Sequence, residues 1–365
     1  MNYASRRDQL RRLLKKQKNA PPALLVTSET NVRYLTGFTG DSSYLLIMAN
    51  DEIIISDKRY TTQLETECPQ IKVDVRGPET KMPDQVGAVV KKLKLTAVGF
   101  ESVNLSVALH ETLGKAMEKV ELVDADGLVE QLRMIKDKDE VQLIREAIHV
   151  AQRSFEVIRA SLRPEQTEKQ VGDAMEMQVR LFGGECTAFT PIIGVGPHAA
   201  LPHYRPGAKK IGESDLVLID WGARVGGYVS DLTRVLATAK ISPKLRKVYG
   251  VVSIAQQRAI DKIRAGVSMK DVDAAARDYI AKSGFGKYFG HGLGHGIGLQ
   301  IHEAPRMGPT ADETLQAGMV VTVEPGVYLP GWGGVRIEDD VLVTKTGHEV
   351  LSDCPKQLEA CVVCQ

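Results

Sequence analysis

Four acidic residues occupy two segments whose sequences are typical of antiparallel hairpins. Asp220 and Asp231 share the first segment, and Glu324 and Glu338 share the second. In each segment, apolar and β-branched runs flank a middle rich in Gly and Pro, which predicts two strands joined by a turn. Like charges that face each other on a sheet repel, and an unpaired buried carboxylate is costly. Two such pairs therefore predict cations held between the acids.

The position of each turn sets the expected register. A turn at Val225 and Gly226 would place the two aspartates opposite each other, and a turn at Gly331 would do the same for the two glutamates. Alternate residues of a strand share a face, so Leu216 and Asp220 should lie on the same side of the first hairpin. A carboxylate that ends this apolar row would be costly without a partner.

Ordinary ion pairs are the alternative for these acids. Asp220 could pair with an arginine such as Arg234, and Glu324 could pair with Arg336. Arg336 could also support a metal ligand from behind. The presence of two acidic pairs of the same design favours cations over separate ion pairs.

Three of the eight histidines, His291, His295 and His302, fall within one glycine-rich segment, GHGLGHGIGLQIHE. His291 and His295 have the i, i+4 spacing of helical zinc sites. Each glycine inside a helix costs about 1 kcal/mol relative to Ala, however, so alternating glycines predict an extended segment. Glycine also lets backbone and substrate approach closely. We expect these histidines to line the same site as the acids.

A further pair, His198 and His203, lies in a loop-like segment before the aspartate hairpin. The residues leave two interpretations of His203 open, namely the mouth of the site and a surface turn.

The charges indicate which cations would fit. Four carboxylates balance two divalent cations, and one neutral imidazole adds a nitrogen ligand without changing the sum. Oxygen-rich ligation with one His suits Mn²⁺, Co²⁺, Fe²⁺ or Zn²⁺. Two such ions about 3.5–4 Å apart activate water and polarise a carbonyl, which predicts hydrolysis. The sequence has no serine nucleophile elbow or cysteine–histidine signature that would compete.

The first 130 or so residues alternate apolar strand patterns with helical patterns, which predicts a sheet flanked by helices. Strands are expected at 23–28, 44–49, 52–56, 72–75, 97–101 and 120–124, and helices at 4–18, 83–94 and 108–118. The segment NVRYLTGFTG has turn chemistry but no phosphate-loop Lys, so we expect no nucleotide site there.

The rest of the chain contains a two-fold repeat. The charged stretch RMIKDKDE marks the boundary between expected domains at 1–132 and 133–365. Beyond it, two helices precede each acidic hairpin, near 139–161, 166–182, 242–264 and 268–283. This order indicates a duplicated helix–helix–hairpin unit whose acids face a shared centre.

Composition restricts the class of protein. A chain of 365 residues favours two domains. The net charge of +1 gives no reason to expect nucleic acid or an anionic membrane as a partner. No apolar run approaches the roughly 20 residues of a membrane span. The basic N-terminus lacks a following apolar stretch, so we expect a surface helix there, with a transit peptide as the alternative.

The cysteines favour a reducing compartment. Five cysteines without a secretory signal predict a cytoplasmic location. Cys361 and Cys364 form a lone C-x-x-C near the C-terminus. A frayed tail is the simpler interpretation, and a metal or redox role is the alternative.

With these motifs in order, the chain resembles the Xaa-Pro peptidases, aminopeptidase P and prolidase, of the M24 metallopeptidase family. The resemblance rests on LPHYRPG, LIDWGARVGGYVSDLTR, GHGLGHGIGLQIHEAP, VEPGVYLP and GGVRIEDDVLV, and extends forward through NVRYLTGFTG and DKRY. It implies an α+β chain: a pita-bread catalytic domain with pseudo-two-fold units, preceded by a smaller creatinase-like α/β domain.

The resemblance also implies roles for the site residues. Five would bind two metal ions, manganese being favoured: Asp220, Asp231, His295, Glu324 and Glu338. Asp231 and Glu338 would bridge both ions, and Glu324 would also act as general base.

The resemblance implies that the remaining polar residues serve the substrate. His203 and His302 would steady the carbonyl and the tetrahedral intermediate and move protons. His291 would line the proline pocket, with Tyr328 and Arg336 in support. The substrate would be a peptide with proline in second position, and the family implies a homodimer.

The length of the substrate depends on a different part of the sequence from the reaction. In prolidases of the eukaryotic type, an arginine in an insertion after the histidines selects dipeptides by their free carboxylate. Here that stretch is short and offers only Arg306. We therefore expect an Xaa-Pro aminopeptidase, with an Xaa-Pro dipeptidase as the alternative.

Three rivals share the fold. They are methionine aminopeptidase, a metal-free creatinase-like hydrolase and a non-catalytic binding module. The N-terminal domain and the histidine pattern argue against the first, and the intact set of five ligands argues against the other two.

Overall fold

The computed structural model describes residues 1–238 and 240–363. The chain forms two compact units, Met1–Arg133 and Met134–Gln365. Cys364 of the C-x-x-C motif lies outside the described residues, so its role stays untested, whereas Cys361 is buried. Within the described residues, every helix is too short or too polar to cross a bilayer.

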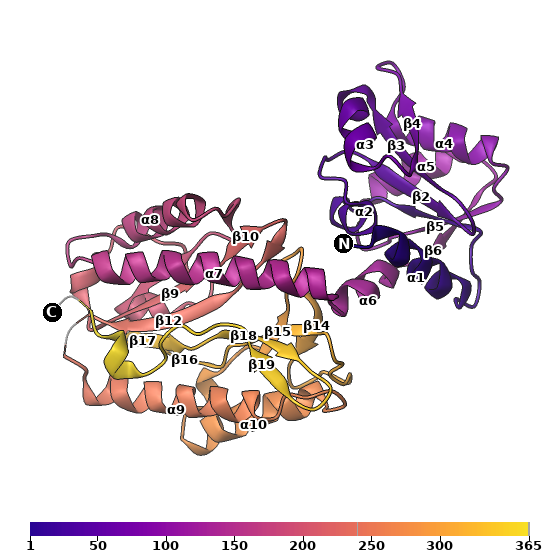
Figure 1. The fold of residues 1–365 in the computed structure, drawn as a ribbon. Helices are drawn as coiled ribbons and strands as arrows, with labels where there is room; N and C mark the ends of the chain where they lie inside the picture. Colours follow the sequence, from indigo (N-terminus) through magenta and orange to yellow (C-terminus); the bar gives the residue numbers. More distant parts are fainter. Residues whose placement is uncertain (239, 364–365) are drawn as a thin grey trace. The chain divides into compact units, whose positions relative to one another are not determined.

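The N-terminal unit is built on a six-stranded mixed sheet (Figure 1). All six expected strands are present: β1 (Ala23–Val26), β2 (Tyr44–Met48), β3 (Glu52–Asp57), β4 (Lys72–Arg76), β5 (Ala97–Phe100) and β6 (Glu121–Asp124). Their spatial order is β4-β3-β2-β1-β5-β6. The central strands β1, β2 and β3 pair antiparallel, and the outer pairs are parallel.

Six helices accompany this sheet: α1 (Tyr3–Lys15), α2 (Glu29–Thr36), α3 (Thr61–Glu67), α4 (Met82–Lys92), α5 (Val107–Ala116) and α6 (Leu128–Met134). Helices α4 and α5 share a core with alternate residues of β1, β2 and β5. The segment NVRYLTGFTG spans residues 31–40, and the turn expected there is wrong for residues 31–36, which belong to α2. Gly37 then ends the helix at a φ of 83°, as in a left-handed helix cap.

Four helices of the second unit match the expected repeat: α7 (Lys138–Ser161), α8 (Glu168–Leu181), α9 (Pro243–Ile260) and α10 (Met269–Lys282). Capping boxes start α7 at Asp137 and α8 at Thr167, which satisfies backbone N–H groups that lack intrahelical partners. The end expected for α9 is four residues too late, because the helix stops at Ile260.

Short strands fill the space between α7 and α8 on one side and α9 and α10 on the other (Figure 1). They are β7 (Cys186–Thr187), β8 (Ile192–Val195), β9 (Leu216–Trp221), β10 (Ala223–Val225), β11 (Tyr228–Val229), β12 (Leu232–Ala237), β13 (Gly294–Gly296), β14 (Glu303–Met307), β15 (Val320–Val323), β16 (Gly326–Leu329), β17 (Gly333–Arg336), β18 (Asp339–Val343) and β19 (His348–Val350). The orders within the sheets are β12-β9-β8, β14-β13-β15-β18-β19, β16-β17 and β11-β10-β7.

Strand β9 separates two hydrophobic cores. Leu216 and Leu218 pack with residues of α9 and α10, and Val217, Ile219 and Trp221 pack with residues of α7 and α8. This alternation confirms the two faces expected for the strand and explains why both are apolar.

The register expected for the aspartate hairpin is wrong by two residues. Asp220 pairs with Thr233, not with Asp231. The turn lies at Gly226 and Gly227, whose φ values are 57° and 84°, and not at the β-branched Val225. A two-residue hairpin turn of this kind needs positive φ at both central positions, which Gly-Gly supplies.

The register expected for the glutamate hairpin is confirmed. Val323 pairs with Asp339 in one ladder and Gly326 pairs with Arg336 in the next, with one constant offset. Glu324 and Glu338 therefore face each other between the two ladders.

The two hairpins meet at one point. Thr233 of β12 forms an isolated antiparallel bridge with Glu338, and the N–H of Asp231 donates to Asp340 Oδ2 over 3.1 Å. This junction brings all four acids to a common centre, as the repeat predicted.

Candidate active site

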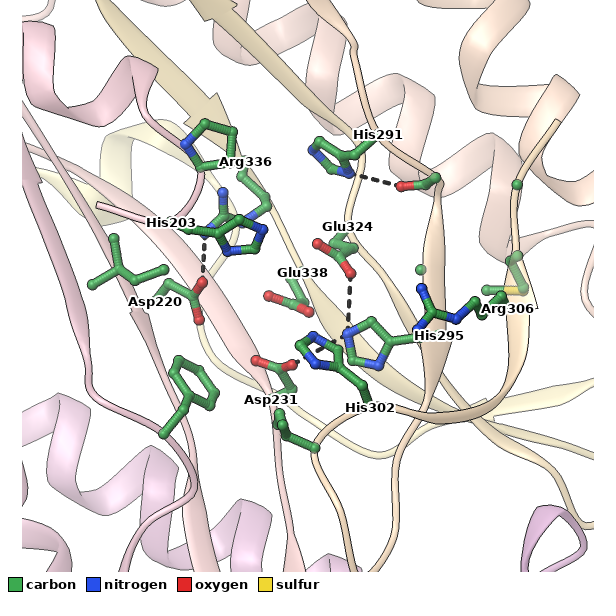
Figure 2. Close-up of a pocket in the computed structure, with 18 of the residues that line it drawn as sticks. His203, Asp220, Asp231, His291, His295, His302, Arg306, Glu324, Arg336 and Glu338 are labelled. Atoms are coloured by element: carbon green, nitrogen blue, oxygen red, sulfur yellow. Dashed lines mark hydrogen bonds and ion pairs between the residues drawn. The ribbon is translucent and has the colours of Figure 1, made fainter. Parts of the chain in front are cut away.

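A cavity of about 760 Å³ in the second unit gathers nearly all the residues singled out from the sequence. Its lining includes His203, Asp220, Asp231, His291, His295, His302, Glu324, Arg336 and Glu338. Figure 2 shows the four acids pointing toward one another, with the histidines around them. Tyr328 is mostly buried behind this lining and contacts two of its members.

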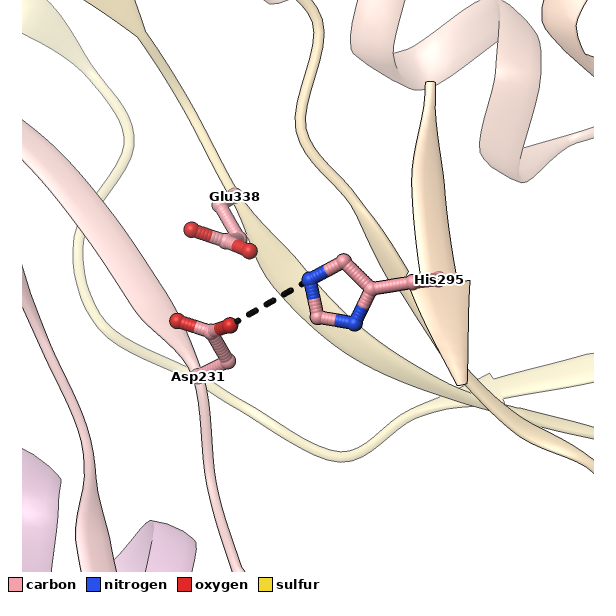
Figure 3. A group of neighbouring side chains, drawn as sticks. All are labelled: Asp231, His295 and Glu338. Carbon is pink, nitrogen blue, oxygen red and sulfur yellow. Dashed lines mark ion pairs between the residues drawn. The ribbon is translucent and has the colours of Figure 1, made fainter. Parts of the chain in front are cut away.

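Three of these side chains converge closely enough to share one metal ion. One ligand atom each from Asp231, His295 and Glu338 lies within 4.8 Å of the others (Figure 3). His295 Nε2 is 3.6 Å from Asp231 Oδ2 and 3.4 Å from Glu324 Oε1. Its Nδ1 lies 3.1 Å from the carbonyl of Gly296. A proton held on Nδ1 by that carbonyl leaves the Nε2 lone pair facing the acids, as metal-ligating histidines require.

Only one of the two carboxylate oxygens of Asp220 has a hydrogen-bond partner among the described residues. Arg336 Nη2 donates to its Oδ2 over 2.5 Å, whereas Oδ1 is buried and has no hydrogen-bond partner among the described residues. The alternative pairing of Asp220 with Arg234 is wrong, because Arg234 binds Asp339 over 2.7 Å. An ion pair of Glu324 with Arg336 is likewise replaced by contacts of Glu324 with His295 and Thr322.

Electrostatics make this cluster a cation acceptor. Burial raises the pKa of Asp231 well above its usual value, and repulsion from Glu338 and Asp220 adds to the shift. Burial, with repulsion from Glu324, does the same to the pKa of Glu338, and burial raises the pKa of Glu324 to about 7. Burial also lowers the pKa of His295 to about 4, so the imidazole is neutral at pH 7. The cluster therefore offers several carboxylate oxygens, one of them without a hydrogen-bond partner among the described residues, beside a neutral imidazole. This set of ligands fits divalent cations.

A chain of hydrogen bonds runs behind the acids. Arg336 donates to the hydroxyl of Tyr328 over 2.8 Å, and that hydroxyl lies 2.8 Å from Nε2 of His291. Arg336 also donates to Thr233 Oγ1 over 3.0 Å, and Thr233 donates to Glu338 over 2.5 Å. The guanidinium thus fixes acids from both hairpins at once.

Several supporting residues were missed from the sequence. Arg277 of α10 donates to the carbonyl of His291 over 2.6 Å, and Asp273 accepts the N–H of Leu293 over 3.1 Å. Together they hold the glycine-rich segment in place. Arg277 and Asp273 look like an ordinary i, i+4 surface pair in the sequence, so no local signal reveals this role.

We expect Asp231→Asn to weaken Mn²⁺ binding by more than about 100-fold, because even losing a residue that only supports a ligand costs roughly 10–100-fold. Isothermal titration calorimetry on protein stripped of metal would measure the change. Asp173→Asn, on the exposed surface of α8, is the matched control. Unchanged Mn²⁺ affinity in the Asp231 variant would contradict its place in the metal site.

The metal-free protein should lose stability as pH rises. The raised pKa values mean that the folded state holds protons more tightly than the unfolded chain does. This stabilisation is full below the unfolded carboxyl pKa of about 4 and is lost as pH rises through about 7 and above. Above about pH 6.5 the buried histidines are neutral in both the folded and the unfolded state, so only the acids contribute to the change. Calorimetric melting of chelated protein from about pH 6.5 to 9 should therefore show a falling Tm, which added Mn²⁺ reverses. A Tm that rises across this range would contradict the uncompensated acids.

Comparison with known proteins agrees with this geometry. Residues 142–345 match metallopeptidase family M24, and residues 6–135 match the creatinase/prolidase N-terminal domain. An Xaa-Pro dipeptidase of Pyrococcus horikoshii is 33% identical over 93% of this chain and 95% of its own.

Solved structures give the same result. An Xaa-Pro dipeptidase of Bacillus anthracis is 37% identical with a TM-score of 0.95, over 99% of this chain and 100% of its own. An X-Pro aminopeptidase of Thermotoga maritima is 34% identical with a TM-score of 0.89, over 98% and 100%. The protein therefore belongs to metallopeptidase family M24 and is a hydrolase with a creatinase-type N-terminal domain and a pita-bread catalytic domain.

Proposed function

We propose that this protein is an Xaa-Pro dipeptidase, which splits a dipeptide between its first residue and a C-terminal proline. The observation that carries the proposal is a cavity that holds both the acid–histidine cluster and the cation Arg306. Arg306 lies on β14 opposite His295, and no carboxylate among the described residues pairs with it. The exposed guanidinium of Arg306 on the cavity wall suits the carboxylate of a C-terminal proline.

The names of the relatives support the dipeptidase more than the aminopeptidase that we expected from the sequence. Full-length relatives from two Pyrococcus species carry the name Xaa-Pro dipeptidase, each 33% identical to this chain. The Thermotoga structure keeps the aminopeptidase as the second candidate.

We propose that Asp220, Asp231, His295, Glu324 and Glu338 hold two divalent ions, with Asp231 and Glu338 shared between them and manganese preferred. The buried, unpartnered Oδ1 of Asp220 supports a cation on its side of the cluster as well. When bound, such ions polarise the scissile carbonyl and lower the pKa of water.

The protein's own groups would handle protons and orientation. Glu324 lines the cavity beside His295, where its carboxylate would accept a proton from the attacking water. His203 and His302 line the cavity, where they would donate hydrogen bonds to the substrate carbonyl as charge develops.

His291 would form part of the proline pocket. Its ring packs edge-on against Phe289 at 5.1 Å and is held by the Tyr328 hydroxyl. A proline ring, which fixes φ and lacks an N–H, would then meet a rigid wall. The homodimer and the cytoplasmic location stay predictions.

A hydrolysis assay would test the function directly. With Mn²⁺, Co²⁺ or Zn²⁺ added in turn, we expect release of proline from Ala-Pro, and little turnover of Ala-Ala or Met-Ala. Faster cleavage of Ala-Pro-Ala than of Ala-Pro would favour the aminopeptidase. Preference for Met-Ala would reject both candidates in favour of a methionine aminopeptidase.

Arg306→Ala should raise KM for Ala-Pro by about 10–100-fold, the loss expected for one hydrogen bond to a charged group. The KM for Ala-Pro amide, which lacks the carboxylate, should stay constant and serves as the control. Arg306→Lys, which keeps the charge but not the planar fork, should recover part of the loss. An equal rise in KM for acid and amide would contradict carboxylate binding by Arg306.

A further inference from the structure

One fully buried carboxylate outside the cavity is unexplained by the function above. Glu168, the first residue of α8, has no solvent exposure. Its Oε1 accepts the backbone N–H of Val195 over 2.9 Å and lies 2.7 Å from Nδ1 of His198. Its Oε2 accepts the hydroxyl of Tyr204 over 2.9 Å and the N–H of Gly207 over 3.0 Å. Four partners offset the cost of burying this group.

All four partners belong to one loop, residues 195–207, and they come from both of its ends. One carboxylate oxygen holds the outgoing end and the other holds the returning end. His198 and Tyr204 also stack on each other with ring centroids 4.5 Å apart. The backbone N–H of Lys169 adds a bond to the carbonyl of Gly207 over 3.0 Å. Glu168 therefore closes the loop into a fixed shape.

This loop carries His203. The residue is exposed and lines the cavity beside Asp220, as Figure 2 shows. Among the described residues, the His203 ring makes no hydrogen bond that would hold it, so its position depends on the backbone that presents it. The adjacent residue, Tyr204, is bonded directly to Glu168. Its first residue, Val195, ends β8, and a short 3₁₀ helix follows at Gly196–Ala200; residues 201–207 belong to no helix or strand.

We propose that Glu168 is a positioning residue whose carboxylate fixes the 195–207 loop so that His203 faces the substrate carbonyl. The inference rests on the proposed role of His203 in Xaa-Pro hydrolysis. Glu168 touches neither the acid cluster nor the cavity, so it acts on the reaction only through the loop. A displacement of about 1 Å in a group that contacts the reacting atoms can cost roughly 100-fold in rate.

A double-mutant cycle on the full-length, Mn²⁺-loaded protein tests this dependence. In Glu168→Gln, an amide NH₂ group replaces one of the two carboxylate oxygens. That group cannot accept the backbone N–H bonded to the oxygen it replaces, so one end of the loop is held less firmly. We expect Glu168→Gln and His203→Ala each to lower kcat for Ala-Pro about 10–100-fold with little change in KM. In the His203→Ala background, Glu168→Gln should change kcat by no more than about twofold, because coupled residues are not additive. Mn²⁺ affinity should be unchanged by Glu168→Gln.

Glu101→Gln is the matched control for loss of a buried carboxylate. Glu101 is 2% exposed in the N-terminal unit and accepts the backbone N–H groups of Thr27 and Ser28. Glu101→Gln should change kcat by the same factor in the wild-type and the His203→Ala backgrounds. If Glu168→Gln fails to fold, Tyr204→Phe removes a single loop bond and should show a smaller loss that also vanishes in the His203→Ala background.

Hydrogen exchange separates this inference from the proposed function, because it needs no substrate. Glu168→Gln should speed amide exchange in peptides covering 195–207 and leave the peptide around Asp220 unchanged. Unchanged exchange in the loop, or multiplicative losses in the cycle, would overturn the positioning role alone. Full turnover in His203→Ala would overturn both this role and the part of the proposed function that assigns His203 to the carbonyl.

Discussion

Repulsion among buried carboxylates is the constraint on which the catalytic unit depends. The junction of two hairpins forces Asp231 and Glu338 into contact range, and burial removes the water that would screen them. Arg336 pairs with one oxygen of Asp220, and the neutral Thr233 bonds one oxygen of Glu338, so the charge of the four acids is offset only in part. The fold thus creates an anionic centre that it does not neutralise with its own cations. A divalent ion is the partner that such a centre accepts with least rearrangement.

The excess of negative charge is confined to the side of the chain that faces the cavity, as the neighbouring Asp339 shows. Asp339 lies between Glu338 and Asp340 in sequence, but period-two alternation turns it to the opposite face. There it is bonded by Arg234, Lys356, Gln256 and Ser352. Burial alone would raise the pKa of Asp339, but Arg234 and Lys356 hold it at about 2. Asp339 is therefore paired inside the fold, whereas Glu338, on the other face, lines the cavity.

Much of this arrangement is encoded in local pattern, and the errors have identifiable causes. The strands of the N-terminal unit and the four long helices follow from apolar periodicity. The acids of the cavity follow from charge in apolar runs, and His291, His295 and His302 follow from their clustering in one glycine-rich segment. The predicted register of the aspartate hairpin was wrong because moving the turn from Val225–Gly226 to Gly226–Gly227 shifts every cross-strand pair by two residues. Only the second turn places glycine at both positions that need positive φ. Glu168 and Arg277 escaped notice because each binds backbone groups of a loop distant in sequence, and such contacts leave no spacing signal in a single sequence.

The same reasoning explains why the motifs predict the reaction better than the substrate. In the proposed function, the acids and His295 would act at the scissile bond, and that chemistry is common to cleavage of dipeptides and of longer peptides. Discrimination between the two depends on what meets the atoms beyond proline. In the proposed dipeptidase, Arg306 on β14, which lines the cavity, would supply that contact. A guanidinium there would favour a free carboxylate over a continuing chain, because it can form a charge-assisted bidentate pair with a carboxylate but not with a neutral peptide group.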